Sequence, residues 1–339
     1  MHSIAVANKT LILPALVPSV SSFETQLRPI PALQLQQTLR EPISLVSAYD
    51  IKNGGEELIN LCREYQRSAV LLLDSGGYEY SRIKRYAGEK APPWTFEDFK
   101  TVCDLNLHDF VFSYDYFWRD PPHQSESADD FELRLVGEIF QDHTFVCAEQ
   151  LIPVLHLQTR NGEERLSEAD TLKLVARLAS ECRSPFIAIP ERELGDGLLE
   201  RFEFAKKICA KLAESNSKVF LHVLGCGNPL SFAFMCVAGA KMADGLEWCR
   251  TFAADNFHLH HFQQEPVFAS QNGGIYNPTA DLLLSMDVPY PIKVATRNLI
   301  SLQNFMADVT HRLSTRTVYE LVATEFGDRA GSALRANEA

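Results

Sequence analysis

The chain has 339 residues, of which 46% are hydrophobic and 22% are charged. This composition is typical of a globular protein, and the length suits a single α/β barrel. No stretch approaches the roughly 20 uninterrupted apolar residues that cross a bilayer, so we expect no membrane association. The formal net charge of −12 argues against a non-specific coat on nucleic acid. This net charge does not exclude binding of a few phosphates through a local basic patch. One such patch is formed by Arg82, Lys84, Arg85 and Lys90.

The cysteines indicate reduced thiols and a cytoplasmic protein. There are eight, and the nearest two, Cys226 and Cys236, stand ten positions apart without any Cys-x-x-Cys pair. This spacing argues against a disulfide framework and against a zinc ribbon. The apolar run 10–18 contains two prolines and lacks a basic segment before it. We therefore predict no signal peptide there.

Strand-like and helix-like segments alternate along the chain, which is typical of parallel βα units. The predicted strands are 43–49, 69–74, 110–115, 151–156, 186–190, 219–224 and 242–246. The predicted helices are 56–65, 96–105, 167–181, 198–213, 230–239 and 297–313. This series predicts an α/β fold, a (β/α)8 TIM barrel over residues 1–326 with insertions near 120–130 and 255–278. A polar tail, expected to be frayed, follows at 327–339.

Three acidic residues stand where predicted strands end. Asp74 follows the apolar run 69–73 and precedes Ser75, Gly76 and Gly77, and Asp115 and Asp244 end two later strands. The carboxyl ends of barrel strands form one face, and that face carries the active site in barrel enzymes. We therefore expect the three carboxylates to meet in one pocket.

Taken one at a time, the three acids allow different interpretations. Asp74 can cap a strand-to-helix turn, with Tyr78 beside it as a surface for stacking a base. Asp115 can cap a helix or pair with Arg119, although an acid among aromatic residues also suits the N–H edge of guanine. Asp244 can act as a nucleophile on a glycosidic carbon, and Glu247 competes with it for that role.

The remaining polar motifs are weaker signals. The segment 222–228 contains Gly225 and Gly227 and resembles a phosphate loop that lacks its lysine. Cys249 with His258, His260 and His261 offers metal ligands, but their spacing matches no common zinc pattern. Solvated or core histidines are the simpler explanation.

In chain order, these segments resemble the tRNA-guanine transglycosylase family over most of the chain. The most specific match is Asp74-Ser75-Gly76-Gly77-Tyr78, which is similar to the family's Asp-Ser-Gly-Gly-aromatic loop. Leu13-Pro14-Ala15-Leu16-Val17-Pro18 resembles its lead-in, and the Gly225–Pro229 turn resembles its Gly-x-Gly-x-Pro turn. The segment from Gly239 to Asp244 resembles its nucleophile segment, and Asn298-Leu299 resembles its closing helix.

The resemblance implies a barrel enzyme that exchanges guanine in a polynucleotide for a 7-deazaguanine. Asp244 would attack C1′ of the target nucleotide, and Asp74 would pass a proton between the leaving and incoming bases. Asp115 would bind the donor edge of the base while Tyr78 stacks on it, and Arg250 would contact the nucleic-acid backbone. The target nucleotide must be flipped out of its stack to be reached.

Two family features are missing from the sequence. The zinc cluster beyond the nucleophile is absent, because no cysteine follows Cys249, so we expect no metal cofactor. Where the family has Gln-Gly-Gly, this chain has a segment in which His156 or Gln158 must hold the base.

The residues from Asp244 to Arg250 are closer to those of the family's DNA-directed branch, which places 7-deazaguanines such as preQ0 into DNA. Enzymes of that branch belong to modification clusters, whose other proteins would be partners. DNA is therefore slightly favoured over tRNA. The alternatives are a tRNA (queuine) enzyme, a non-catalytic nucleic-acid-binding subunit, and an unrelated barrel glycosidase that uses Asp74 and Asp244.

Overall fold

A computed structural model gives the fold of this chain. It describes residues 2–23, 25–81, 93–114, 136–137, 139, 144–157, 166–216, 218–253, 257, 259–261, 279, 282 and 285–338. Within these ranges, no helix is both long and apolar enough to cross a bilayer.

Eight parallel strands form the centre of the molecule, in the spatial order β7-β6-β5-β4-β3-β10-β9-β8. They are β3 (Ala15–Val20), β4 (Ile43–Ser47), β5 (Val70–Asp74), β6 (Phe110–Phe112), β7 (Leu151–Ile152), β8 (Phe186–Pro190), β9 (Phe220–Leu224) and β10 (Met242–Gly245). A parallel bridge between Val154 and Ala188 joins the β7 edge to the β8 edge. The predicted (β/α)8 barrel is therefore confirmed.

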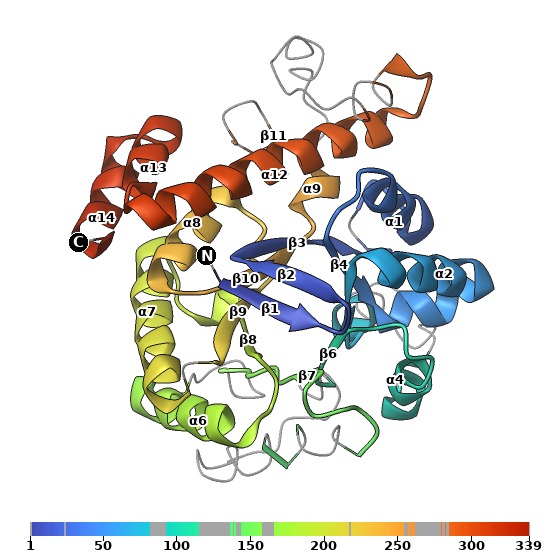
Figure 1. Ribbon diagram of the computed structural model, residues 1–339, viewed down its shortest axis with the longest axis horizontal. Helices are drawn as coiled ribbons and strands as arrows, with labels where there is room; N and C mark the ends of the chain where they lie inside the picture. The colour runs from blue at the N-terminus through green and yellow to red at the C-terminus, as the bar shows by residue number, and fades with distance from the viewer. Residues whose placement is uncertain are drawn as a thin grey trace.

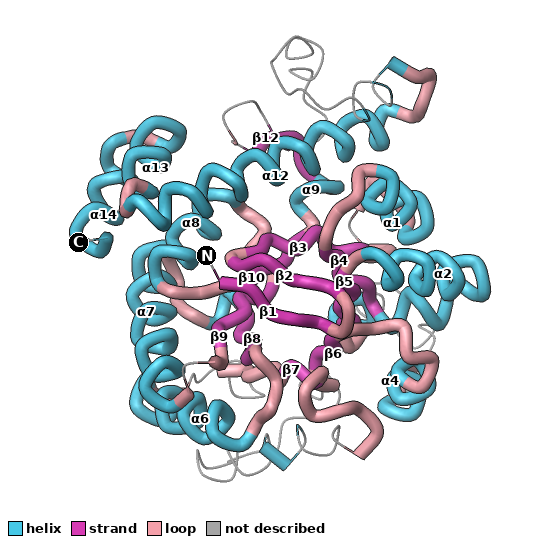
Figure 2. Tube along the Cα trace, in the orientation of Figure 1, coloured by secondary structure: helices cyan, strands magenta, loops and turns pink. Residues whose placement is uncertain are grey.

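Helices surround the strands as an outer ring (Figure 2). They are α1 (Pro29–Thr38), α2 (Ala48–Ser68), α4 (Phe96–Cys103), α6 (Glu168–Glu181), α7 (Leu198–Ser215), α8 (Pro229–Ala238), the short α9 (Glu247–Arg250), α12 (Tyr290–Thr315), α13 (Val318–Phe326) and α14 (Asp328–Glu338). A 3-10 turn, η2 (Glu191–Glu193), follows β8, and a small hairpin, β11 (Thr251–Ala253) and β12 (Leu259–His261), follows α9. The long α12 crosses beside the ends of β3 and β10 (Figure 1).

Side-chain caps fix where several helices begin. Thr95 and Asp98 form a reciprocal capping box at α4, and the Ser167 side chain accepts a hydrogen bond from the Asp170 amide at α6. Asn228 caps α8 through the amides of the next turn. These caps satisfy backbone donors that the first turn of a helix leaves unpaired.

An N-terminal hairpin, β1 (His2–Val6) and β2 (Lys9–Leu13), lies across one mouth of the barrel (Figure 1). Its Leu11 and Leu13 are buried in the same cluster as the apolar side chains of the barrel interior. The Lys9 ammonium bonds to the Asp109 carboxylate and to two backbone carbonyls near the start of β5. The hairpin therefore closes the amino-terminal mouth, which leaves the carboxyl-terminal mouth for a site.

The described chain differs from the sequence-based predictions in several places. The segment 327–339 was expected to be a frayed tail, but α14 packs through the fully buried Leu334, and the Glu338 carboxylate accepts bonds from the first amides of α13. The first barrel strand, β3, was not among the predicted strands, and it contains Pro18, a residue that is rare in central strands. β7 has only two residues instead of six.

Candidate active site

The inward side chains of four neighbouring strands change from apolar to polar towards the carboxyl-terminal mouth. Val17, Leu45, Leu72 and Met242 belong to the buried cluster inside the barrel. Side chains alternate across a strand, so the residues two positions later face inward as well. These residues are Ser19, Ser47, Asp74 and Asp244. The barrel thus ends in a polar layer built from strands β3, β4, β5 and β10.

Asp74 lies at the end of β5 in a tight turn that glycine makes possible. Its Oδ2 atom accepts a hydrogen bond from the Gly76 amide at 3.1 Å. Gly76 has φ +80°, and a Cβ there would lie 2.8 Å from the Tyr49 backbone nitrogen. The Ser75 hydroxyl accepts the Gly77 amide, and its carbonyl accepts the Trp94 indole N–H. The turn-capping interpretation is correct for this geometry, and the same carboxylate also faces the pocket described below.

Asp244 is held by hydrogen bonds to both carboxylate oxygens. His222 Nε2 lies 2.8 Å from Oδ1, the Gly225 amide donates to the same oxygen at 3.1 Å, and the Ser19 hydroxyl donates to Oδ2 at 3.1 Å. Gly225 presents its amide from a turn with φ +72°. These donors fix the carboxylate while its remaining lone pairs stay available.

His222 is fully buried, and its Nδ1 has no hydrogen-bond partner among the described residues. Its ring packs edge-on against Phe112, with centroids 5.0 Å apart. Because a carboxylate oxygen accepts, the hydrogen of the contact with Asp244 belongs to Nε2 of His222.

Asp74 and Asp244 line one pocket of about 500 Å³ at the carboxyl-terminal ends of the strands. This volume is in the range of small-molecule sites. The other predicted residues in its wall are Ser75, Tyr78, His156, Gly225 and Arg250, together with the rival acid Glu247. Gly76 and Gly77 shape the turn behind Asp74. The convergence expected for two of the three acids is therefore observed.

His156 enters the pocket wall from the loop after β7. Its Nδ1 lies 2.9 Å from Glu193 Oε1, and the other oxygen of Glu193 accepts the Leu157 amide at 2.6 Å. Both side chains are buried. The carboxylate fixes the orientation of the imidazole, which can then offer a hydrogen bond to a bound group.

Arg250 and Glu247 form an ion pair one helical turn apart on α9, with Arg250 Nη2 2.7 Å from Glu247 Oε1. The second oxygen of Glu247 packs over Gly227, where an added Cβ would lie 1.7 Å from it. Gly227 is therefore needed for this close approach and does not itself line the pocket with the acids. Asp244 and Glu247 are both held by neighbouring groups, so both remain candidates for the nucleophile on these contacts.

Two further acids lie behind Asp74. Glu79, from the helical turn at 77–81, is 2% exposed, and Asp50, from the first turn of α2, is 3% exposed. Burial, with the nearby charges of Asp50 and Asp74, raises the pKa of Glu79 to about 8. Burial also raises the pKa of Asp50 to about 6, against bonds from Ser22 that lower it.

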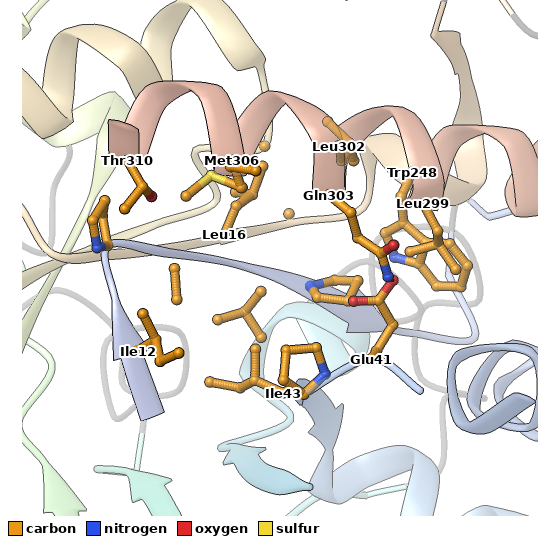
Figure 3. A pocket seen from close by; sticks show the side chains of 18 of the residues that line it. Ile12, Leu16, Glu41, Ile43, Trp248, Leu299, Leu302, Gln303, Met306 and Thr310 are labelled. Atoms are coloured by element: carbon orange, nitrogen blue, oxygen red, sulfur yellow. The ribbon is translucent and has the colours of Figure 1, made fainter. Parts of the chain in front are cut away.

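A second pocket, of about 620 Å³, lies between α12 and strands β3 and β4. Figure 3 shows Leu299, Leu302 and Met306 of α12 facing Leu16 and Ile43 across it. Its one buried acid is Glu41, whose Oε1 accepts a hydrogen bond from Gln303 Nε2 at 2.7 Å, and burial raises the pKa of Glu41 to about 8. This pocket is mostly apolar and contains neither Asp74 nor Asp244, so we place the candidate chemistry in the smaller one.

Some predicted site residues cannot be placed. Asp115 and Gln158 lie outside the described residues, as do His258 and the basic patch from Arg82 to Lys90. Among the described residues, no three His, Cys, Asp or Glu side chains gather as a metal site would require.

Sequence reasoning missed four polar residues of this site. Ser19, Glu79 and Glu193 carried no motif, and His222 was noted only as part of a strand. The alternation of inward residues could have pointed to Ser19 and His222, since each stands two positions after an inward apolar residue. The pairings of Glu79 and Glu193 depend on contacts between distant segments.

A scan against protein-family models finds no match, and a search of curated proteins finds no significant relative.

Proposed function

We propose that this barrel is a base-exchange transglycosylase that replaces guanine in a polynucleotide with a 7-deazaguanine such as preQ0. The observation that carries the proposal is that Asp74 and Asp244 share one pocket at the carboxyl-terminal mouth. The order of motifs along the chain, described above, supplies the reaction.

In the first half of the proposed reaction, a carboxylate oxygen of Asp244 attacks C1′ of the target nucleotide. The C1′–N9 bond breaks, its electron pair goes to guanine, and Asp74 supplies a proton to the leaving base. In the second half, the incoming base gives a proton to Asp74 and attacks C1′, which releases Asp244. The bonds from Ser19, His222 and Gly225 hold Asp244 in one orientation, as in-line attack requires.

The rest of the pocket suits a nucleotide substrate. Tyr78 offers a ring on which a base can stack, and its neighbour Phe23 supports it edge-on with centroids 6.3 Å apart. Arg250 can contact a phosphate or sugar through a planar guanidinium. His156, fixed by Glu193, takes the place of the family's base-holding amide. DNA is the favoured polynucleotide, with tRNA as the alternative.

The decisive experiment is incubation of the purified protein with radiolabelled guanine and either plasmid DNA or bulk tRNA. We expect label to enter DNA more than tRNA, and a covalent protein–DNA adduct to survive a denaturing gel. Asp244→Asn should abolish the adduct, whereas Glu247→Gln should retain it.

An adduct that persists in Asp244→Asn and is lost in Glu247→Gln would transfer the nucleophile to Glu247. Absence of exchange on both nucleic acids, with release of sugar from oligosaccharides, would replace the proposal with a barrel glycosidase.

A further inference from the structure

Glu79 forms part of the pocket wall and is held there by two serine hydroxyls. Ser21 Oγ lies 2.6 Å from Glu79 Oε1, and Ser47 Oγ lies 2.8 Å from Oε2. The serines come from the end of β3 and the end of β4, so Glu79 joins two strands next to Asp74. A hydroxyl can donate or accept, so this pair of bonds suits either protonation state of the carboxyl group.

The surroundings of Glu79 disfavour its ionised form. Asp50 and Asp74 are the nearby acids. Tyr49 is also close, and besides burial the charge of Glu79 is one of the causes that raise the pKa of its hydroxyl. Asp50 accepts the Ser22 amide at 2.7 Å. Among the described residues, no lysine, arginine or histidine forms an ion pair with Glu79 or Asp50. Neighbouring buried carboxyl groups without a counter-charge cannot all ionise.

We propose that Glu79 stays a neutral carboxylic acid beside Asp74 and thereby controls when Asp74 can give its proton to the leaving base. This inference rests on the proposed base exchange. Glu79 acts here as a positioning residue, because it works through Asp74 and does not touch the reacting atoms.

The physical effect is one of like charges. When Glu79 is neutral, Asp74 can lose its proton to the leaving base and regain one from the incoming base. When Glu79 ionises, a second negative charge beside Asp74 holds the Asp74 proton in place, so Asp74 gives it up less readily to the leaving base and the first half-reaction slows. The raised pKa of Glu79, about 8, puts this change just above neutral pH. The other titratable side chains in the pocket wall are Tyr78, His156, Glu191, Arg192, Asp244, Glu247 and Arg250.

The test compares Glu79→Gln with a matched control, Glu41→Gln. Both replace a buried acid with a pKa raised to about 8 by a neutral amide of the same shape, but Glu41 lies in the apolar pocket under α12 (Figure 3). The measurement is the rate of labelled guanine exchange from pH 6 to pH 10.

We expect the wild-type rate to fall through a limb centred near pH 8. In Glu79→Gln the rate at pH 7 should stay within roughly threefold of wild type, and the limb should move up by about one pH unit or more. Glu41→Gln should keep the wild-type profile.

A second readout does not require activity. Infrared spectra of protein with ¹³C-labelled glutamate should show protonated carboxyl C=O bands at pH 7, one of which disappears in Glu79→Gln. An unchanged rate profile in Glu79→Gln, with exchange intact, would overturn the inference and leave the proposed function standing. Loss of the band without any exchange would overturn the proposed function and leave the neutral Glu79 standing. Loss of a carboxylate band in Glu79→Gln, with the protonated C=O bands unchanged, would show an ionised Glu79 and refute the inference directly.

Discussion

Replacement of Glu41 by glutamine should stabilise the protein, and by more as the pH rises. Glu41 is 6% exposed, and burial raises its pKa from 4.5 to about 8, which outweighs the hydrogen bond from Gln303. Between these two pH values the folded state holds a proton that the unfolded state has released. The free energy of unfolding of the wild type therefore falls as the pH rises through this window.

The magnitude follows from the size of the pKa shift. A shift of 3.5 units, the difference between about 8 and 4.5, corresponds to about 5 kcal/mol at 1.36 kcal/mol per unit. Glutamine carries no proton to lose, and its side-chain oxygen can still accept the bond from Gln303. We expect Glu41→Gln to match wild type near pH 4 and to exceed it by up to about 5 kcal/mol at pH 8.

Urea unfolding of both proteins at half-unit steps from pH 4 to pH 8.5 measures this difference. Glu79 contributes a similar pH dependence to both proteins, so it cancels in the comparison. A difference between variant and wild type that stays constant over the whole range would refute the reasoning, because it would mean that Glu41 has the same pKa folded and unfolded.

The turn at Asp74 and the anchor of Asp244 give two more predictions. Gly76→Ala should lower the free energy of unfolding by about 1–3 kcal/mol, since φ is +80° and the new Cβ would press on the Tyr49 backbone; unchanged urea midpoints would contradict this. Ser19→Ala removes one of the donors to Asp244 and should slow adduct formation about tenfold, as expected for one bond to a charged group. An adduct rate equal to wild type would mean that His222 and Gly225 orient the carboxylate without help.

The sequence was sufficient for features that depend on local patterns. The run from Val70 to Leu73 indicates a buried strand. The carboxylate and the two glycines at its end indicate a turn at the carboxyl-terminal mouth of the barrel. The same reasoning located β8 and β10 closely. It did not identify β3, which contains Pro18; in the structure Pro18 pairs with β10, while the ladder to β4 begins only at Ser19.

Residues whose role depends on distant partners could not be predicted. Glu79 looks like any helix-surface acid in the sequence, and only the approach of Ser21 and Ser47 makes it a buried carboxyl group. The tail shows the same limit. Its polar composition suggested fraying. In the structure Leu334 is buried in the apolar cluster between the helices, and this packing stabilises α14.

The positions of the two acids in the barrel bear on which bond they would act upon. β5, which carries Asp74, and β10, which carries Asp244, are separated in the sheet by β4 and β3. Both side chains nevertheless line one pocket at the carboxyl-terminal mouth, so a single bound substrate can contact both acids. A retaining glycosidase places its two carboxyl groups about 5–5.5 Å apart, on either side of one glycosidic bond. In the proposed exchange the sugar faces Asp244 while the base extends towards Asp74 and Tyr78. A complex in which a single pyranose ring touches both carboxylates would favour the glycosidase instead.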